Sequence, residues 1–171
     1  MNTFVVAEAE RLFEHIEDSD LAKLCEIAIH DSEEFAARYP KYQAAVVCIA
    51  LCQGAALHYV DGRHGVKDFD VWTFYASGET PAFPVRRRRS RDFEESKFGK
   101  HSGDTRLVGR RVDLLGRSIE HRSHCVFSRQ AYLRDARTRT AGKLSEKPVV
   151  LVYPAALRGQ VVWPVSDKAR Q

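Results

Sequence analysis

The sequence of 171 residues contains no apolar run long enough to cross a membrane, and it contains little cysteine. Its longest apolar run, Ala44–Cys52, has nine residues, whereas a membrane-spanning helix needs roughly 20. Its four cysteines are too few and too scattered for a disulfide scaffold. The first twenty residues carry six acids, which excludes a secretory signal there. These absences favour a reducing, cytoplasmic setting with no membrane among the partners.

The chain does contain enough apolar and aromatic material for one folded domain. Hydrophobic residues make up 44% of it and 17 residues are aromatic, which excludes a disordered chain. We expect a single domain over residues 1–165, with a helical layer over 1–40 and a sheet core over 44–165. Residues 166–171 are expected to form a frayed tail.

Charge is distributed unevenly along the chain. The formal net charge is +4. Residues 1–40 hold ten acids and three bases, and residues 85–111 hold ten Arg and Lys against four acids. Such runs are often only solvated faces, but this asymmetry suggests that the middle of the chain meets an anionic partner.

Three helices are predicted in the first forty residues, over 4–17, over 20–30 and over a short stretch that ends before Pro40. The first two show apolar residues at helical spacing. The expected N-terminal caps of the second and third helices are Asp18 with Ser19 and Asp31 with Ser32.

The rest of the chain predicts a mixed sheet of about four strands, so the expected fold class is α+β. β-Branched and aromatic residues between turn signals mark the strands. The expected strands are 44–52, 69–75, 111–115 and 148–153, with a short last one at 161–163. Helical segments are expected at 55–60 and 128–137, a loop at 77–84, and an irregular polar segment at 86–109.

Three aspartates carry the main chemical signal. Asp68 and Asp70 are two residues apart, so on a strand both carboxylates project from one face. Two carboxylates on one face repel each other, and a divalent cation offsets that repulsion most directly. Asp113 lies inside another apolar strand and would complete the cluster. We therefore expect Mg²⁺ or Mn²⁺ at Asp68, Asp70 and Asp113, a ligand set suited to phosphoryl displacement. The bland alternative is that Asp68 caps a turn and Asp70 faces water.

A glycine precedes these acids at the end of the buried run. Gly54-Ala55 opens a short helical turn, where backbone N–H groups can approach phosphates. The combination of Gly54-Ala55, a twelve-residue spacer, Asp68-Phe69-Asp70 and a later strand aspartate resembles the nucleotidyltransferase superfamily with the DNA polymerase β-like fold, in its minimal form. The resemblance covers roughly residues 44–116.

The resemblance implies an activity and a site. The activity is the transfer of a nucleoside monophosphate from a nucleoside triphosphate to a hydroxyl acceptor of unknown kind. The catalytic and metal residues would be Asp68, Asp70 and Asp113, the last one activating the acceptor hydroxyl. Gly54, Ala55 and Lys67 would bind the nucleotide. The acceptor is left open between a nucleic acid, a protein and a small molecule, and a homodimer is left open as well.

Ala55 departs from the family pattern, which commonly has serine or glycine at this place. The loss of one phosphate contact weakens binding by about 1 kcal/mol. This departure favours the alternative of a catalytically degenerate binding or regulatory module.

An arginine-rich run follows the second predicted strand. Its members Arg86, Arg87, Arg88, Arg89 and Arg91 are candidates for binding an anionic substrate, because guanidinium groups recognise phosphate bidentately. The alternative is that they pair with the acidic helices.

Two other classes of site stay open. Glu95-Ser96-Lys97 matches half of a restriction-type nuclease motif, although it lies in a polar stretch. A zinc site at His121, His124 and Cys125 is also open, but without ligand pairs at familiar spacing.

Overall fold

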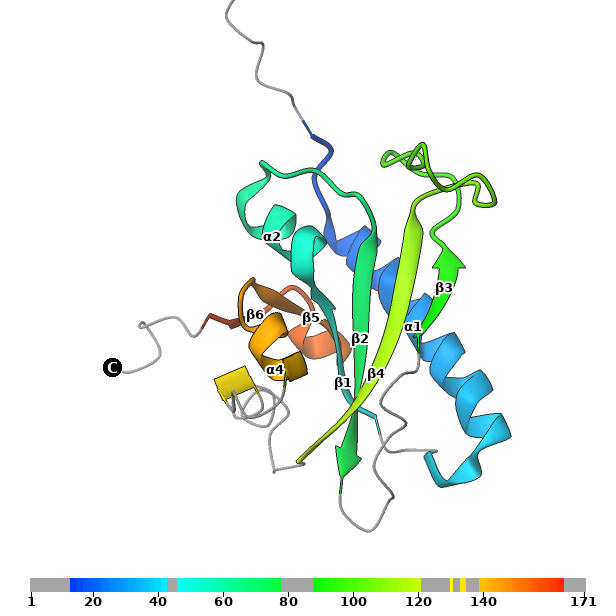
Figure 1. Ribbon diagram of the computed structural model, residues 1–171, viewed down its shortest axis with the longest axis vertical. Helices are drawn as coiled ribbons and strands as arrows, with labels where there is room; N and C mark the ends of the chain where they lie inside the picture. Colours follow the sequence, from blue (N-terminus) through cyan, green and yellow to red (C-terminus); the bar gives the residue numbers. More distant parts are fainter. Residues whose placement is uncertain are drawn as a thin grey trace, which may run out of the picture.

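The computed structural model describes residues 13–42, 46–77, 88–120 and 139–164, together with residues 130, 133 and 134. Within these ranges the chain is α+β, with a mixed six-stranded sheet and a long helix on one face (Figure 1). The prediction of an α+β fold with a mixed sheet is therefore confirmed, and the expected four strands become six. Among the described residues, no helix is both long and apolar enough to cross a membrane.

The sheet has the strand order β3-β4-β2-β1-β5-β6. The strands are β1 (Val46–Cys52), β2 (Phe69–Ser77), β3 (Arg88–Asp92), β4 (Arg111–Glu120), β5 (Val149–Tyr153) and β6 (Val161–Trp163). β2 and β4 are parallel and the other described neighbours are antiparallel. Because β2 and β4 are parallel, their first residues lie side by side at the same end of the sheet.

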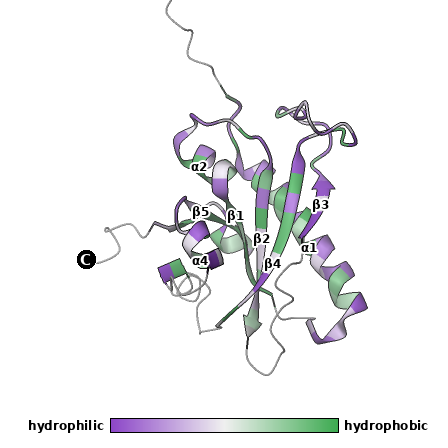
Figure 2. Cartoon of the chain, in the orientation of Figure 1, coloured by the Kyte–Doolittle hydropathy of each residue, from purple (hydrophilic) through white to green (hydrophobic). Residues whose placement is uncertain are grey.

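β3 corrects the expectation of an irregular segment after residue 86. Its five residues are all polar, and it pairs with β4 at the edge of the sheet. Figure 2 shows β3 as hydrophilic. An edge strand needs no apolar face of its own, because backbone hydrogen bonds to one neighbour hold it. Hydrophobic alternation therefore gave no sign of this strand.

The predicted helices at 20–30 and at 31–39 form one continuous helix, α1 (Asp18–Arg38). It has no break at Ser32, whose hydroxyl donates to the carbonyl of Ile29 within the helix (2.8 Å). The helix begins after Glu17, whose backbone N–H donates to the Asp20 carboxylate (2.8 Å). The expected caps are therefore wrong. The helix predicted over 4–17 is wrong for residues 13–17, which are irregular, and its remainder lies outside the described residues.

The remaining helical elements are α2 (Gln53–Asp61), α4 (Arg139–Leu144), and two short 3₁₀ turns, η1 (Pro40–Tyr42) and η2 (Ala155–Leu157). α2 confirms the short helix expected after the first strand, and it ends at Gly62 in a left-handed conformation (φ 68°). The helix expected over 128–137 falls mostly outside the described residues, as does the tail at 166–171. Of the loop expected at 77–84, only Ser77 is described, and it is the last residue of β2.

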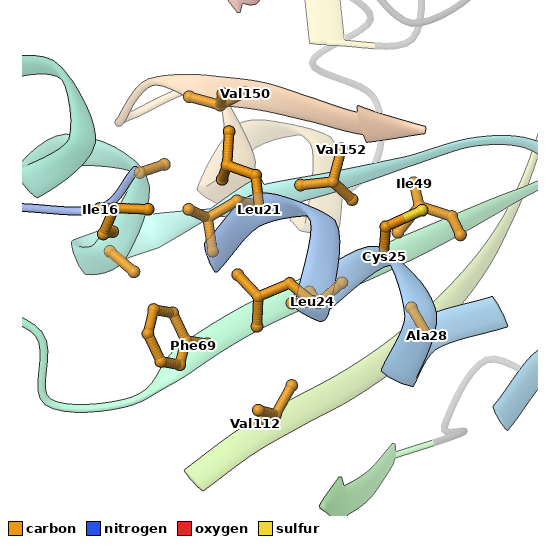
Figure 3. Packing of buried hydrophobic residues seen from close by; sticks show 14 of the residues in the cluster. Ile16, Leu21, Leu24, Cys25, Ala28, Ile49, Phe69, Val112, Val150 and Val152 are labelled. Atoms are coloured by element: carbon orange, nitrogen blue, oxygen red, sulfur yellow. The ribbon is translucent and has the colours of Figure 1, made fainter. Parts of the chain in front are cut away.

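The core lies on both faces of the sheet. On one face α1 packs Leu21, Leu24 and Ala28 against strand residues that include Phe69 and Val112 (Figure 3). On the other face α4 packs Leu144 in a second cluster with alanine, cysteine and aliphatic residues of β1, β5 and β6. α1 covers its face along much of the sheet (Figure 1), whereas α4 has only six residues. The short α4 leaves the first residues of β2 and β4 free to line a pocket.

Candidate functional site

The three predicted aspartates lie together at the start of β2 and β4. Asp70 stands directly opposite Asp113 in the parallel register of these strands, and Asp68 comes two residues before Asp70 on the same side of the backbone. Phe69, between the two acids, and Val71, after Asp70, are fully buried in the cluster under α1. Alternation along the strand thus sends apolar side chains to the α1 face and carboxylates to the opposite face.

These carboxylates line a pocket of about 760 Å³, which we call the carboxylate pocket. It is bounded by the start of β2 and β4, by Gln53 and Gly54 at the start of α2, and by α4. Besides the three acids it is lined by five bases, which are Lys67, Arg88, Arg139, Lys143 and Lys147. A pocket that brings carboxylates and several cations together is suited to a ligand that carries both metal and phosphate.

The site disfavours the charged form of Asp70. Burial, and after it the neighbouring charges of Asp68 and Asp113, raise the pKa of Asp70 to about 6. Arg88 and Lys143 oppose this effect. A carboxyl group with this pKa is ionised only near neutral pH and above, and a bound cation would relieve the repulsion among the three acids.

Asp113 is held by its neighbours on the edge strand. Its side chain is only 2% exposed. Arg88 Nη2 donates to one carboxylate oxygen (2.5 Å), and the Ser90 hydroxyl donates to the other (2.7 Å). Ser90 stands opposite Asp113 in the antiparallel register of β3 and β4. The edge strand that hydrophobicity did not predict therefore positions the third acid.

Arg111 links the acids and was missed in the sequence. Its Nη2 donates to Asp68 (2.8 Å) and its Nη1 donates to Asp104 (3.3 Å), while its Nε lies 3.4 Å from Asp113. The hydrogen bond to Asp68 is the main cause that raises the already high pKa of Arg111. Arg111 is two residues before Asp113 on β4, and two residues is the spacing that places side chains on one face.

The arginine run splits across the two faces of β3. Arg88 reaches the carboxylate pocket. Arg89 and Arg91 point to the opposite face and pair there with Asp31 and Glu34 of α1, at 3.2–3.5 Å except for a closer contact between Arg91 and Glu34. For Arg89 and Arg91 the structure therefore agrees with the alternative prediction, in which the arginines pair with an acidic helix. Arg86 and Arg87 lie outside the described residues.

The start of α2 brings one of the two expected glycine-turn residues into the pocket. Gly54 lines it, and a side chain added there would meet no atom within 4 Å. Ala55 instead is buried in the cluster under α1. Gln53, which the motif did not include, has a left-handed backbone (φ 58°), lines the pocket and donates through Nε2 to the carbonyl of Lys143 (3.4 Å). A serine at position 55 would therefore point away from the pocket.

α4 and the residues that follow it supply a cationic wall that sequence reasoning also missed. Arg139, Lys143 and Lys147 follow one another at intervals of four residues and all line the pocket. Arg139 and Lys143 are four apart on α4, where such residues share one face, so their spacing was a usable signal, whereas Lys147 follows the end of the helix. The helix itself was hard to predict, because it buries only Ala141 and Leu144, and two residues do not make a recognisable apolar pattern.

The acids match a hard divalent cation in donor type, but they do not form a ready-made cage. Among the described residues, no group of three or more His, Cys, Asp and Glu side chains is spaced to hold a metal ion. Arg88 and Arg111 already pair with Asp113 and Asp68. The charges of Asp68 and Asp113 still raise the pKa of Asp70, although burial is the larger cause. Cation binding therefore requires the guanidinium groups to give way to the metal or to turn toward a phosphate.

The alternative nuclease motif does not reach this pocket. Lys97 forms ion pairs with Glu17 and Asp20 at 3.1 Å near the start of α1, and Glu95 is exposed. The pocket lining includes neither Glu95 nor Lys97. The alternative zinc residues, at 121, 124 and 125, lie outside the described residues.

Comparisons of the chain with protein-family models, with curated proteins and with solved structures found no match in any of the three.

Proposed function

We propose that the protein transfers a nucleoside monophosphate from a nucleoside triphosphate to a hydroxyl acceptor, in the manner of a minimal nucleotidyltransferase. The observation that carries this proposal is the placement of three carboxylates and five bases around one pocket. The carboxylates match the metal and the bases match the polyphosphate. Neither group alone would distinguish a transferase from an ordinary charged surface.

Asp68 and Asp70 would hold Mg²⁺ or Mn²⁺, which supplies polarisation of the phosphate that is attacked. Arg88 has a side chain that is 62% exposed, so it is free to turn from Asp113 toward a phosphate oxygen. Asp113 then accepts the proton of the acceptor hydroxyl, with the Ser90 hydroxyl holding its second oxygen. The acceptor oxygen forms a bond to the α-phosphorus, the bond from that phosphorus to the bridging oxygen breaks, and pyrophosphate leaves.

The remaining cations bind the β- and γ-phosphates. Lys143 is near enough to Asp70 to lower the pKa of that carboxyl, and Arg139 and Lys147 lie beside it in the pocket lining. The start of α2 adds backbone N–H groups next to Gly54, where space is open. These groups stabilise the negative charge that develops on the leaving pyrophosphate.

A second candidate is a binding module that holds a phosphate ligand without catalysis. The observation that favours it is the pairing of Asp113 with Arg88 and of Asp68 with Arg111. In such a module the arginines stand in place of the metal. Its ligand would bind equally well with and without a divalent cation.

A thermal-shift titration separates these candidates. Each of the four nucleoside triphosphates is added with and without Mg²⁺ to the unmodified protein, to Asp68→Asn and to Asp18→Asn. Asp18 is a matched control because its side chain is 77% exposed on α1. A ligand at a hundred times its Kd stabilises the folded state by about 2.7 kcal/mol.

For the transferase, we expect a metal-dependent shift in the unmodified protein and in Asp18→Asn, and none in Asp68→Asn. Release of pyrophosphate from the bound nucleotide in the presence of candidate acceptors would then test transfer itself. A shift of the same size without metal favours the binding module. No shift with any nucleotide overturns both candidates.

A further inference from the structure

One part of the carboxylate pocket is apolar. Trp72, Leu115 and Leu144 line it beside the charged groups. Trp72 stands opposite Leu115 in the register of β2 and β4, and Leu144 belongs to the core cluster against which Trp72 packs. A site for inorganic polyphosphate alone has no use for such a surface, because phosphates are fully polar.

Trp72 is held in place but not enclosed. It is only partly buried, packs against the second core cluster, and has its ring nearly parallel to that of Phe74 (6.2 Å between ring centres, 27° between planes). It also lines the pocket. A tryptophan with support from its own strand and an open side toward a pocket offers a fixed aromatic surface to a planar ligand.

The position of Trp72 relative to the acids matches the shape of a nucleotide. Trp72 follows Asp70 by two residues on β2, so both project from the same face about 7 Å apart. In a nucleotide a single ribose separates the base from the α-phosphate, which is a comparable span. An α-phosphate at the carboxylates thus places its base at Trp72.

We propose that Trp72 stacks on the base of the nucleotide and makes the pocket selective for nucleoside triphosphates over inorganic triphosphate. This inference rests on the function proposed above, because it takes the carboxylates as the place of the α-phosphate. Stacking requires only a flat aromatic face, so every base meets it. Selection among the bases is therefore weak at this position.

The test uses the intrinsic fluorescence of the protein, which has two tryptophans. Trp163 is replaced by phenylalanine, so that Trp72 is the one remaining tryptophan and can be excited apart from the tyrosines. The indole of Trp163 donates to the carbonyl of Ser145 (2.8 Å), and thermal unfolding checks that its loss leaves the variant folded. ATP with Mg²⁺ is expected to quench the fluorescence of Trp72, while inorganic triphosphate with Mg²⁺ binds without comparable quenching.

Affinity gives the second readout, in the background with both tryptophans. Trp72→Leu is expected to weaken binding of ATP by about 5- to 100-fold, in line with stacking on an aromatic side chain, and to leave the affinity for inorganic triphosphate unchanged. Trp72→Phe keeps an aromatic face and is expected to lose less affinity for ATP than Trp72→Leu. The unchanged affinity for inorganic triphosphate also shows that a variant still forms the pocket.

The outcomes separate the two proposals. If ATP and inorganic triphosphate bind equally with Mg²⁺ and neither quenches Trp72, base stacking is overturned while the phosphate and metal site stands. Equal loss of both ligands in Trp72→Leu also overturns it, because Trp72 then only supports the fold. If neither ligand binds the unmodified protein with Mg²⁺, the proposed function fails and this inference fails with it.

Discussion

Replacing Asp70 by asparagine should stabilise the protein in the absence of metal. In the unmodified protein Asp70 ionises beside Asp68 and Asp113, within a partly buried site. The amide of asparagine has nearly the same shape and no charge. The substitution therefore removes the burial cost of the charge and the repulsion from both neighbours.

The size of this effect follows from the pKa of Asp70, which is about 6 in the folded protein against 3.8 as its ordinary value. Each pKa unit corresponds to about 1.4 kcal/mol, so the ionised group costs the folded state about 3 kcal/mol. Folding raises the pKa of Asp70. Below the pKa of the unfolded state Asp70 is protonated in both states, so its charge does not lower the free energy of unfolding there. The cost grows as the pH rises between the two values and is complete above the folded one.

The assay is urea unfolding of the unmodified protein and Asp70→Asn across this range. The variant should be more stable by about 3 kcal/mol near pH 8, by about half as much near pH 5, and by about 0.5 kcal/mol near pH 4. Added Mg²⁺ should narrow the gap near pH 8, because it stabilises only the protein that keeps all three carboxylates. A gap that does not vary with pH, or a variant less stable near pH 8, would refute the electrostatic reasoning.

Asp92→Asn is the matched control with the opposite sign. Burial raises the pKa of Asp92, but the backbone N–H groups of Val108, Glu94 and Gly109, at 2.6–2.8 Å, outweigh burial and lower it below its ordinary value. Here folding favours the charged form. The neutral amide should therefore make the protein less stable near neutral pH, and this loss should disappear as the pH falls.

Two further predictions concern the residues around the site. Gly109→Ala should lower stability by about 2 kcal/mol or more, because the new methyl carbon would lie 1.7 Å from the backbone carbonyl oxygen of Glu94. Urea unfolding measures this, and Gly103→Ala, which meets only the His101 side chain at 3.5 Å, should cost much less; equal losses would contradict the steric argument. Arg111→Gln should increase the thermal shift caused by Mg²⁺, because it removes the cation that holds Asp68. An unchanged or smaller shift would show that Arg111 does not compete with the metal.

The alternation of residue types along the strands determined much of the site in advance. Because Phe69 and Val71 are on one side and Asp68 and Asp70 on the other, the carboxylates had to face away from the cluster that buries Phe69 and Val71. The same alternation in β4 applied to Asp113 between Val112 and Leu114. Local pattern decides these directions because the side chains of a strand have a period of two.

The sequence pattern alone did not predict β3, and so it did not predict how the arginine run divides. An all-polar segment shows no hydrophobic period, and its pairing with β4 is a matter of backbone hydrogen bonds to a distant partner. Once β3 forms, alternation sends Arg88 to the pocket and Arg89 and Arg91 to the acids of α1. The sequence shows a run of arginines, but the pairing of β3 in the sheet decides which carboxylates each arginine contacts.

The amino-acid sequence by itself determined that the chain folds as α+β with a mixed sheet and that Asp68 and Asp70 share one face. Those properties depend on neighbours a few residues apart. Only the tertiary structure decided that Asp113 lies opposite Asp70, that Arg111 and Arg88 hold the acids, and that the bases of α4 close the pocket. These contacts join segments far apart in the chain, and their geometry depends on strand register and packing, which no local pattern encodes.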